Sequence, residues 1–202
     1  MGPPFLLCYS LSYGERLAGK GKLCLEAGVG GLRAEFKVQY QQGVARWVSE
    51  MGPEGDTRRF TEFAGTEASP VFGFKVLPDQ AQIRLDSGST YSFPWVSPVY
   101  DPLSLLINLP RSVTSTRRFE MVGGHAFAQK LAEESLPVLE RPTSCSVYRV
   151  SPGTVLAYFH PSGYPVQILE QRGAHVLTAS LVSVERELAP SGRRRKRPKE
   201  RR

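Results

Sequence analysis

Alternating apolar and polar side chains constrain the fold of this chain more than any other feature of its sequence. In residues 32–41 every second side chain is apolar, from Leu32 to Tyr40, and the side chains between them are charged or polar. A period of two residues is that of a β-strand with one buried and one solvated face. Gly, Pro and Asp interrupt comparable segments about every 8–12 residues, which predicts an antiparallel meander.

The meander is expected to contain about ten to twelve strands in a single β-rich domain over residues 1–188. The GVGG run at residues 28–31 is predicted to form a hairpin turn, and residues 57–63 an edge or strongly exposed strand, because polar residues flank Phe60. Residues 126–136 fit a helix or a hairpin, and the hairpin is favoured. The other predicted strands are residues 9–13, 22–27, 32–41, 44–51, 72–77, 81–86, 89–95, 144–150, 154–160, 164–172 and 174–188.

One short central helix is expected. Asp101 is a preferred N-cap residue, and Pro102 stands at the first helical position, where proline is favoured. The apolar residues that follow predict a short helix that ends at Pro110. These apolar residues are Leu103, Leu105, Leu106, Ile107 and Leu109.

The net charge of +7 is confined to the last ten of the 202 residues. Residues 193–202 hold eight of the 26 Lys and Arg residues and one of the 19 Asp and Glu residues, which leaves 18 of each kind in residues 1–192. A run of like charges around a proline buries too little apolar area to offset the entropy of ordering. Residues 189–202 are therefore expected to be a linker and a basic disordered tail.

The three cysteines, Cys8, Cys24 and Cys145, show no CxxC pair and no spacing typical of metal ligands. The favoured interpretation is three buried, reduced thiols that act as small hydrophobic side chains. The alternative is one disulfide between Cys8 and Cys24 across a first hairpin, if the chain enters an oxidising compartment. The sequence shows no secretory signal and no run of the roughly 20 apolar residues that cross a bilayer. The expectation is a cytoplasmic protein as the sequence is written, or a periplasmic or envelope protein if the true start lies upstream.

No group of residues in the sequence predicts catalysis or metal binding. His125, His160 and His175 lie far apart without an HExxH motif, and each is expected to be a surface or turn residue. There is no GxSxG nucleophile motif, and the GVGG run lacks the lysine and the following helix of a phosphate-binding loop. We therefore expect neither an enzyme nor a bound metal or cofactor.

Aromatic side chains on the predicted strands are the first indication of a function. A curved antiparallel sheet can hold an apolar ligand against aromatic side chains on its concave face, whereas most aromatic side chains on strands belong to the core. The sequence leaves both interpretations open. The candidates for lining a ligand site are Phe36, Tyr40, Trp47, Tyr91, Phe93 and Trp95.

The basic tail is the second indication of a function. Its cations would neutralise the phosphates of a nucleic acid, or the head groups of an anionic membrane surface, without reading a base sequence. A third interpretation is a solubilising terminus without a dedicated partner. The phosphate-binding candidates are Arg193, Arg194, Arg195, Lys196, Arg197, Lys199, Arg201 and Arg202.

Three short motifs resemble a family of uncharacterised bacterial envelope proteins, a domain-of-unknown-function group whose β-sheet fold is similar to that of the periplasmic lipoprotein carriers. YSLSY at residues 9–13, with Ala18-Gly19 and the alternating residues 22–26, is similar to the first hairpin of that family. DPLSLL at residues 101–106 resembles its short central helix, and YPVQI at residues 164–168 resembles one of its late strands.

This resemblance spans about residues 8–188. It implies a half-open barrel around a short helix, with an interior suited to an acyl chain and with no established activity. Members of the family usually begin with a signal peptide and do not usually end in a basic run such as residues 193–202. The missing signal peptide argues against the envelope location that the family implies. The basic run permits a nucleic-acid-binding role that the family does not imply.

The sequence thus predicts a mainly β fold: a single antiparallel meander that forms a curved sheet or half-open barrel with one short central helix. The expected function is non-enzymatic binding of an apolar or lipid-like ligand, or of a protein partner, on the concave face of the sheet. The alternative is a cytoplasmic nucleic-acid-associated protein that binds phosphates non-specifically through its tail.

Overall fold

A computed structural model describes residues 5–28, 30–41, 43–65, 69–95 and 98–186. The predicted linker and basic tail lie outside these residues. The described elements are β1 (Phe5–Tyr13), β2 (Arg16–Gly28), β3 (Gly31–Tyr40), β4 (Gly43–Met51), β5 (Thr57–Gly65), β6 (Pro70–Val76), β7 (Gln80–Leu85), β8 (Thr90–Pro94), α1 (Pro102–Ser112), β9 (Thr116–Met121), β10 (Gly124–Lys130), β11 (Glu134–Val138), β12 (Arg141–Ser151), β13 (Val155–Phe159), β14 (Pro165–Arg172) and β15 (His175–Arg186).

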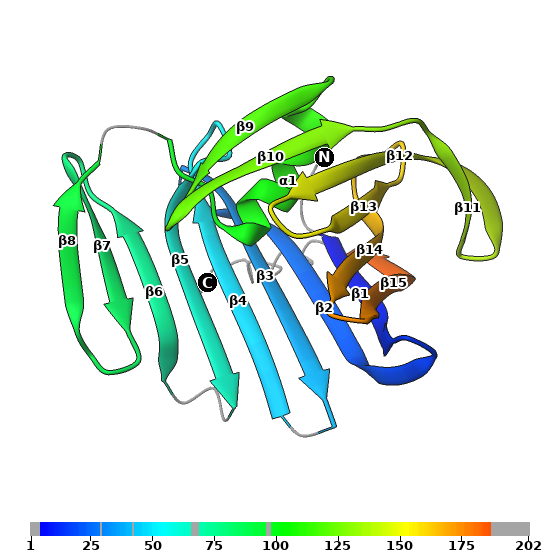
Figure 1. Ribbon diagram of the computed structural model, residues 1–202, viewed down its shortest axis with the longest axis horizontal. Coiled ribbons are helices and arrows are strands. Elements are labelled where there is room, and N and C mark those ends of the chain that lie inside the picture. The colour runs from blue at the N-terminus through cyan, green and yellow to red at the C-terminus, as the bar shows by residue number, and fades with distance from the viewer. Residues whose placement is uncertain (1–4, 29, 42, 66–68, 96–97, 187–202) are drawn as a thin grey trace, which may run out of the picture.

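All fifteen strands belong to one antiparallel sheet, which curls around α1 as a half-open barrel (Figure 1). From one edge the order of the strands runs from β8 back to β1, continues with β15, β14, β13 and β12, and ends with β10 and β9, while β11 pairs with β12 off this path. β1 pairs with β15, so the first and last described strands meet in the middle of the sheet. The predicted fold class is confirmed: a mainly β meander with one short helix, left unclosed between β8 and β9.

The helix α1 packs between two walls of the curled sheet. Leu103 and Ile107 lie in one apolar cluster with side chains of β1, β2 and β3, among them the fully buried Leu25 and Ala34. Leu105 and Leu109 lie in a second cluster with side chains of β9, β10, β12 and β13. Apolar residues on both sides of one short helix therefore hold the two halves of the sheet at a fixed separation. Among the described residues, no helix is long and apolar enough to span a membrane.

Several strand predictions are confirmed and others are wrong. The hairpin at residues 28–31 is present, with Gly28 opposite Gly31 and Gly30 at a φ of +78°. The region after Gly124 is strand β10 and not a helix. The number of strands was predicted too low, partly because β11 escaped notice: Pro137 lies opposite Pro142, and two prolines hide a strand pair from a pattern based on β propensity.

Residues 57–63 do not form an edge strand. They lie in β5, which pairs with β4 on one side and β6 on the other. Thr57 is fully buried, although its polarity suggested exposure. The reason is that its hydroxyl is hydrogen-bonded inside the protein, as described below.

The predicted end of the helix at Pro110 is also wrong, because α1 continues to Ser112. Proline lacks the N–H that would donate to the carbonyl four residues earlier, but the residues after it can still donate to carbonyls of the preceding turn. The Ser112 hydroxyl donates to the Asn108 carbonyl at 2.8 Å, and the Val113 N–H donates to the Leu109 carbonyl at 3.1 Å. These two bonds support the last turn beyond the proline.

The predicted facing of Cys8 and Cys24 is not observed. The register of the β1–β2 hairpin places Cys24 opposite Leu6 and Cys8 opposite Lys22. The two cysteines are diagonal neighbours, and diagonal pairs lie farther apart than the roughly 3.5–4.5 Å between Cβ atoms that a disulfide needs. Of the three thiols that were expected to be buried, Cys145 is buried, whereas Cys8 and Cys24 are only half-buried.

A buried polar network fastens the N-terminus of α1 to the sheet. The Asp101 carboxylate accepts hydrogen bonds from the hydroxyls of Ser49 at 2.5 Å and Thr57 at 2.6 Å, which come from β4 and β5. It also accepts the backbone N–H groups of Leu103 and Ser104, and the Ser104 hydroxyl accepts from the Asp101 N–H to complete a capping box. Both oxygens of this buried carboxyl group are hydrogen-bonded, which offsets part of the cost of removing it from water.

A second polar side chain ties the middle of the helix to a loop. The Asn108 amide donates to the Gly55 carbonyl at 2.9 Å and to the Ser104 carbonyl at 2.7 Å. Gly55 has a φ of +85°, and a Cβ there would collide with the Asn108 side chain. The β4–β5 turn is therefore shaped to receive the helix.

We predict that Asp101→Ala lowers the free energy of unfolding by about 3–5 kcal/mol, because it removes the N-cap and leaves two buried hydroxyls without their acceptor. Asp101→Asn is expected to cost only about 1–2 kcal/mol, since its amide oxygen still accepts the helix N–H groups. Urea denaturation of the two variants and the wild type measures both values. Equal losses for Ala and Asn would contradict the role assigned to the cap.

The stability of the wild type relative to Asp101→Asn is also expected to depend on pH. Burial raises the pKa of the Asp101 carboxyl above its ordinary value, against the opposing effect of its hydrogen bonds. The folded state then binds this proton more tightly than the unfolded chain, so the contribution of Asp101 to stability is greatest below the unfolded pKa of about 4 and falls as pH rises through the raised folded value. The stability difference between wild type and Asp101→Asn should therefore shrink as pH rises.

Candidate ligand-binding cavity

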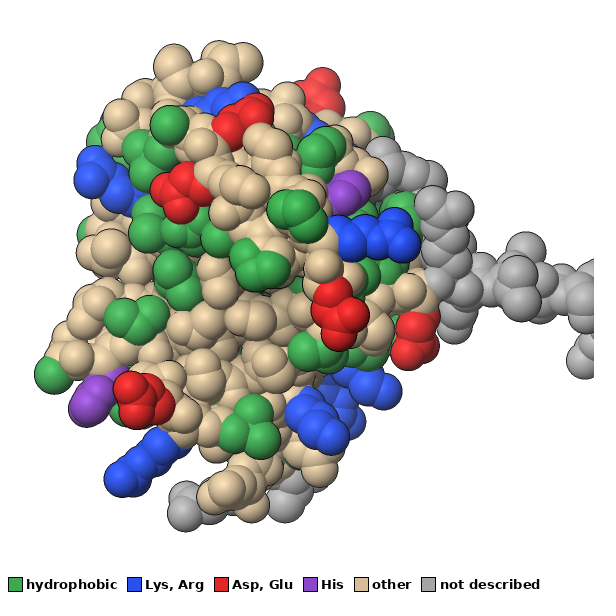
Figure 2. All heavy atoms as spheres, turned by 90° about the vertical axis from the view of Figure 1, so that its right-hand side faces the viewer, with side chains coloured by type: hydrophobic (Ala, Val, Ile, Leu, Met, Phe, Trp, Pro, Cys, Tyr) green, Lys and Arg blue, Asp and Glu red, His purple; other side chains and the backbone are tan. Residues whose placement is uncertain are grey.

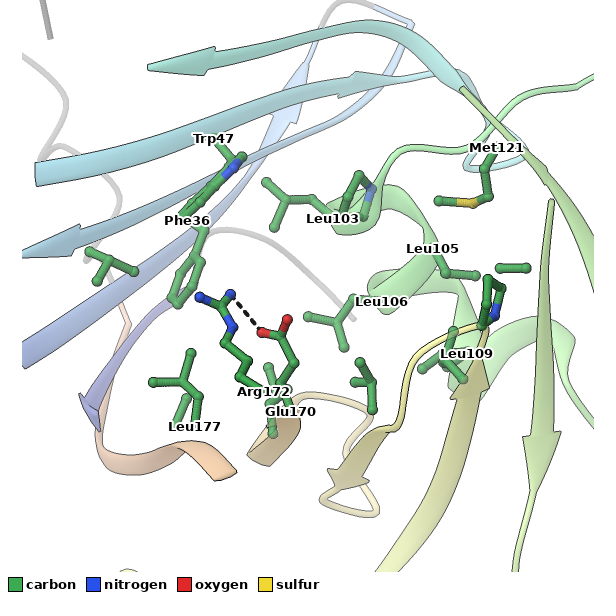
Figure 3. A pocket seen from close by; sticks show the side chains of 18 of the residues that line it. Phe36, Trp47, Leu103, Leu105, Leu106, Leu109, Met121, Glu170, Arg172 and Leu177 are labelled. Atoms are coloured by element: carbon green, nitrogen blue, oxygen red, sulfur yellow. Dashed lines mark hydrogen bonds and ion pairs between the residues drawn. The ribbon is translucent and has the colours of Figure 1, made fainter. Parts of the chain in front are cut away.

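A cavity of about 530 Å³ lies between the concave face of the sheet and α1. Residues from both halves of the sheet and from the helix line it (Figure 3). Nearly all of the lining side chains are apolar. The complete set of lining residues, polar ones included, is Leu11, Phe36, Val38, Tyr40, Trp47, Pro102, Leu103, Leu105, Leu106, Leu109, Met121, His125, Ala126, Val150, Pro152, Val155, Ile168, Glu170, Arg172, Leu177 and Ala179.

Aromatic rings of β3 and β4 form one wall of the cavity. The rings of Phe36 and Trp47 stack with centroids 5.9 Å apart, because these residues lie directly opposite each other across the β3–β4 pair. Tyr9 of β1, which is buried and does not line the cavity, meets the Phe36 ring edge-on with centroids 6.1 Å apart. Gly21 leaves room for Phe36, since a Cβ at that position would lie 3.0 Å from the ring.

The buried Tyr9 fixes this wall to the other half of the sheet. Its hydroxyl donates to the Pro165 carbonyl at 2.8 Å, a contact between β1 and β14. Burial raises the pKa of Tyr9 well above its ordinary value, so the hydroxyl keeps its proton for this bond. The position of the Phe36 ring therefore depends on residues from both ends of the described chain.

Two charged side chains of β14 stand where the cavity opens to solvent. The Arg172 guanidinium and the Glu170 carboxylate form an ion pair at 2.8 Å, and their side chains are 53% and 39% exposed. Figure 3 shows both side chains projecting from β14 in the direction of Phe36. The hydrogen bond to Glu170 raises the pKa of Arg172. Both residues line the cavity and are about half exposed, so they lie where it opens to solvent, as do the exposed lining residues His125 and Pro152.

The strand register defines which end of the barrel holds this mouth. Arg172 lies opposite His175 in the β14–β15 hairpin, and Tyr13 at the end of β1 lies opposite Leu177. The Tyr13 hydroxyl donates to the Arg172 carbonyl at 3.3 Å, and its ring packs 4.9 Å from that of His175. Tyr40 ends β3 at the same end of the sheet, while Asp101 and its partners lie at the opposite end.

The sequence-predicted aromatic candidates occupy two separate regions. Phe36, Tyr40 and Trp47 come together on the cavity wall. Tyr91, Phe93 and Trp95 do not line the cavity: Tyr91 is 57% exposed, and the other two lie edge-on at 5.8 Å beside an apolar cluster around Phe74 and Val99. The eight phosphate-binding candidates of the tail, Arg193, Arg194, Arg195, Lys196, Arg197, Lys199, Arg201 and Arg202, lie outside the described residues.

Sequence reasoning missed the residues of the helix and of β14 that line the cavity. Leu103, Leu105, Leu106 and Leu109 were assigned to a helix without a stated partner. In β14 the side chains of Ile168, Glu170 and Arg172 share one face by their spacing of two, and that alternation was the available signal. Nothing in a local pattern, however, shows that this face is the concave one.

The three histidines lie apart in the structure. His125 lines the cavity and meets the Phe127 ring edge-on at 5.2 Å. His160 is a turn residue, as predicted: its Nδ1 accepts the Ser162 N–H at 3.0 Å, and its ring stacks on Tyr164 at 4.6 Å. Partial burial lowers the pKa of His160. In the part of the chain that the structure describes, no three His, Cys, Asp or Glu residues gather as metal ligands would.

The outer surface carries charges of both signs. On the face shown in Figure 2, Lys and Arg side chains are interspersed with Asp and Glu side chains and with hydrophobic ones. An ion-pair cluster on β2 and β3 joins Arg33 to Glu26 at 2.5 Å and to Glu35 at 2.6 Å. This mixture agrees with the balanced charge of residues 1–192.

These features define a half-open β-barrel with an apolar internal cavity. Among solved structures, the fold is similar to that of a β-barrel-like protein of the domain of unknown function DUF1849 from Brucella abortus, with a TM-score of 0.60 and 10% sequence identity. The match covers 90% of this chain and 97% of that one, so the likeness extends over the whole barrel. No protein-family model and no curated protein matches the sequence. The expected likeness to an uncharacterised bacterial β protein is confirmed at the level of fold.

We predict that Phe36→Ala lowers the free energy of unfolding by about 1–2 kcal/mol, because it enlarges a hollow that already meets solvent. Phe74→Ala is the matched control: Phe74 is 2% exposed, and its removal should leave a closed void and cost about 3–5 kcal/mol. Urea denaturation of both variants measures the difference. A loss at Phe36 as large as that at Phe74 would show that Phe36 acts as a core residue.

Proposed function

We propose that this protein is a non-enzymatic binding protein that takes an apolar or lipid-like ligand into the cavity between the concave sheet and α1. The observation that carries the proposal is the cavity of about 530 Å³ with its almost entirely apolar lining. Sites for small molecules typically measure about 300–1,000 Å³ and are lined by hydrophobic and aromatic side chains with a few polar groups. The mouth of a β-barrel is a preferred place for such a site.

The character of the lining supports binding in preference to catalysis. Apart from Tyr40, His125, Glu170 and Arg172, the described residues that line the cavity are apolar, and Glu170 is held in an ion pair with Arg172. The buried hydroxyls of Ser49 and Thr57 and the carboxylate of Asp101 are hydrogen-bonded to one another and lie outside the lining. The resemblance to envelope proteins with a fold like that of the lipoprotein carriers favours the same class of ligand.

The tryptophans offer a direct test. The chain has two, and Trp47 lines the cavity while Trp95 does not. In a Trp95→Phe variant, titration with 1-dodecanol is expected to shift the Trp47 emission to shorter wavelength in a saturable way, because the ligand displaces water from the ring. At a free dodecanol concentration 100 times its Kd, the free energy of unfolding should rise by about 2.7 kcal/mol.

The complementary variant, Trp47→Phe, retains Trp95 and should show no such shift. An unchanged Trp47 emission throughout the titration would contradict the proposal.

A second matched pair of variants tests where dodecanol binds. Leu106→Asp places a charge on the cavity wall and should weaken dodecanol binding at least about tenfold, because burying a charge beside an apolar ligand is costly. Val182→Asp, on a side chain 54% exposed and outside the lining, should leave it unchanged.

The basic tail favours a second candidate function. Eight cations within residues 193–202, beside a globular part with balanced charge, would bind phosphates of nucleic acid without sequence preference. In this alternative the barrel serves a separate purpose.

A salt series tests the alternative. We predict that, if the tail is a nucleic-acid arm, the affinity of the full chain for a fluorescent oligonucleotide falls about 10³-fold or more between about 50 and 200 mM salt. A variant with the eight Lys and Arg residues of the tail changed to Gln should lose this binding. Retention of the binding by that variant would remove the basis for the alternative.

A further inference from the structure

The ion pair at the mouth is an unusual feature of the cavity. Among the described residues that line it, Glu170 and Arg172 are the charged ones besides the titratable His125. They follow Ile168 on the same face of β14, so this face changes from apolar to charged as it approaches the mouth. An apolar interior with charge at one end has the polarity of an amphiphile.

A comparable ion pair on β9 shows that Arg172 differs from another paired arginine in its position beside the cavity and not in the pairing itself. On β9 the guanidinium of Arg118 and the carboxylate of Glu120 also stand two residues apart, at 2.9 Å and with side chains 57% and 41% exposed. These values are close to those of the pair on β14. The pair on β9 does not line the cavity. Such a pair by itself contributes little to stability, since both charges remain in contact with water.

We propose that Arg172 binds the carboxylate head group of a single-chain fatty acid whose hydrocarbon chain occupies the cavity. This inference rests on the proposed function. The guanidinium already holds a carboxylate, that of Glu170, at 2.8 Å, and its planar donors match that group. The ligand carboxylate takes the place of Glu170, and Arg172 is exposed enough to exchange one for the other at modest cost of desolvation.

The two ends of the cavity fix the orientation of the ligand. At the helix end the lining is apolar, with Leu103, Leu106 and Pro102. The buried carboxylate of Asp101 is hydrogen-bonded on both oxygens outside the lining and so offers nothing to the ligand. The hydrocarbon end therefore lies against α1 and the head group lies at the mouth.

The test compares dodecanoate with 1-dodecanol, which has the same chain and a neutral head. The full chain with Trp95→Phe reports cavity binding through Trp47, and at pH 7 the carboxylate is ionised. We expect dodecanoate to bind about tenfold more tightly than dodecanol. Arg172→Gln should remove this preference by weakening dodecanoate alone, and Arg118→Gln, the matched control, should keep it.

Two further variants sharpen the test. Glu170→Gln removes the competing carboxylate and should tighten dodecanoate binding severalfold while leaving dodecanol unchanged. Arg172→Lys should restore part of the preference, since it keeps the charge and loses the planar pair of donors. Acetate, which is the head group alone, should compete only weakly because it leaves the apolar cavity unfilled.

The outcomes separate this inference from the proposed function. If dodecanol binds and dodecanoate binds no more tightly, or if Arg172→Gln weakens both ligands equally, the inference is wrong and the apolar site stands. If neither ligand alters the Trp47 emission in any variant, the inference and the proposed function both fail. A preference for dodecanoate that depends on Arg172 and not on Arg118 supports both.

Discussion

The hydrogen bonds of the buried Asp101 carboxylate are the interaction on which the rest of the structure depends. A carboxylate removed from water is costly unless donors surround it, and here two hydroxyls from the sheet and two N–H groups of the helix do so. The donors come from β4, β5 and α1, so the carboxylate is satisfied only when the helix stands at one place inside the sheet. Apolar packing alone would permit the helix to slide; the polar network does not.

This fixed position of α1 explains why a cavity is left over. The helix is attached at the end of the barrel that holds Ser49 and Thr57, and its apolar side chains cover the sheet there. Toward the other end, where β3 and β14 finish, the facing side chains of Tyr40 and Arg172 line open space instead. Apolar side chains that line a solvent-open hollow of this size keep surface in contact with water, which contributes less to stability than packing against other apolar groups. A ligand that fills the space supplies such packing.

Local sequence patterns predicted the fold well because alternation and turns are local properties. The period of two in β3 identifies which side chains share a face, and so groups Phe36 with Tyr40. It does not show where along a curled sheet that face will lie, and Phe93 and Trp95 satisfied the same pattern at the far edge, away from the cavity. The prediction of an edge or exposed strand over residues 57–63 fails at Thr57 because its partner, Asp101, lies 44 positions away in the sequence.

The charges of β14 show most clearly why a site of this kind is hard to find from sequence. Glu170 and Arg172 lie in the predicted strand of residues 164–172, and nothing local marks them out, since charged side chains about half exposed are common at the end of a strand. Their place beside a cavity arises only when β14, β15 and β1 pair and bring the mouth next to the ring of Phe36. The same Arg–Glu spacing on β9 has no cavity beside it. The same spacing of an Arg and a Glu thus has a different meaning on the two strands because the sheet is curved, and the polarity of the cavity, apolar at the helix and charged at the mouth, is a property of the folded half-open barrel.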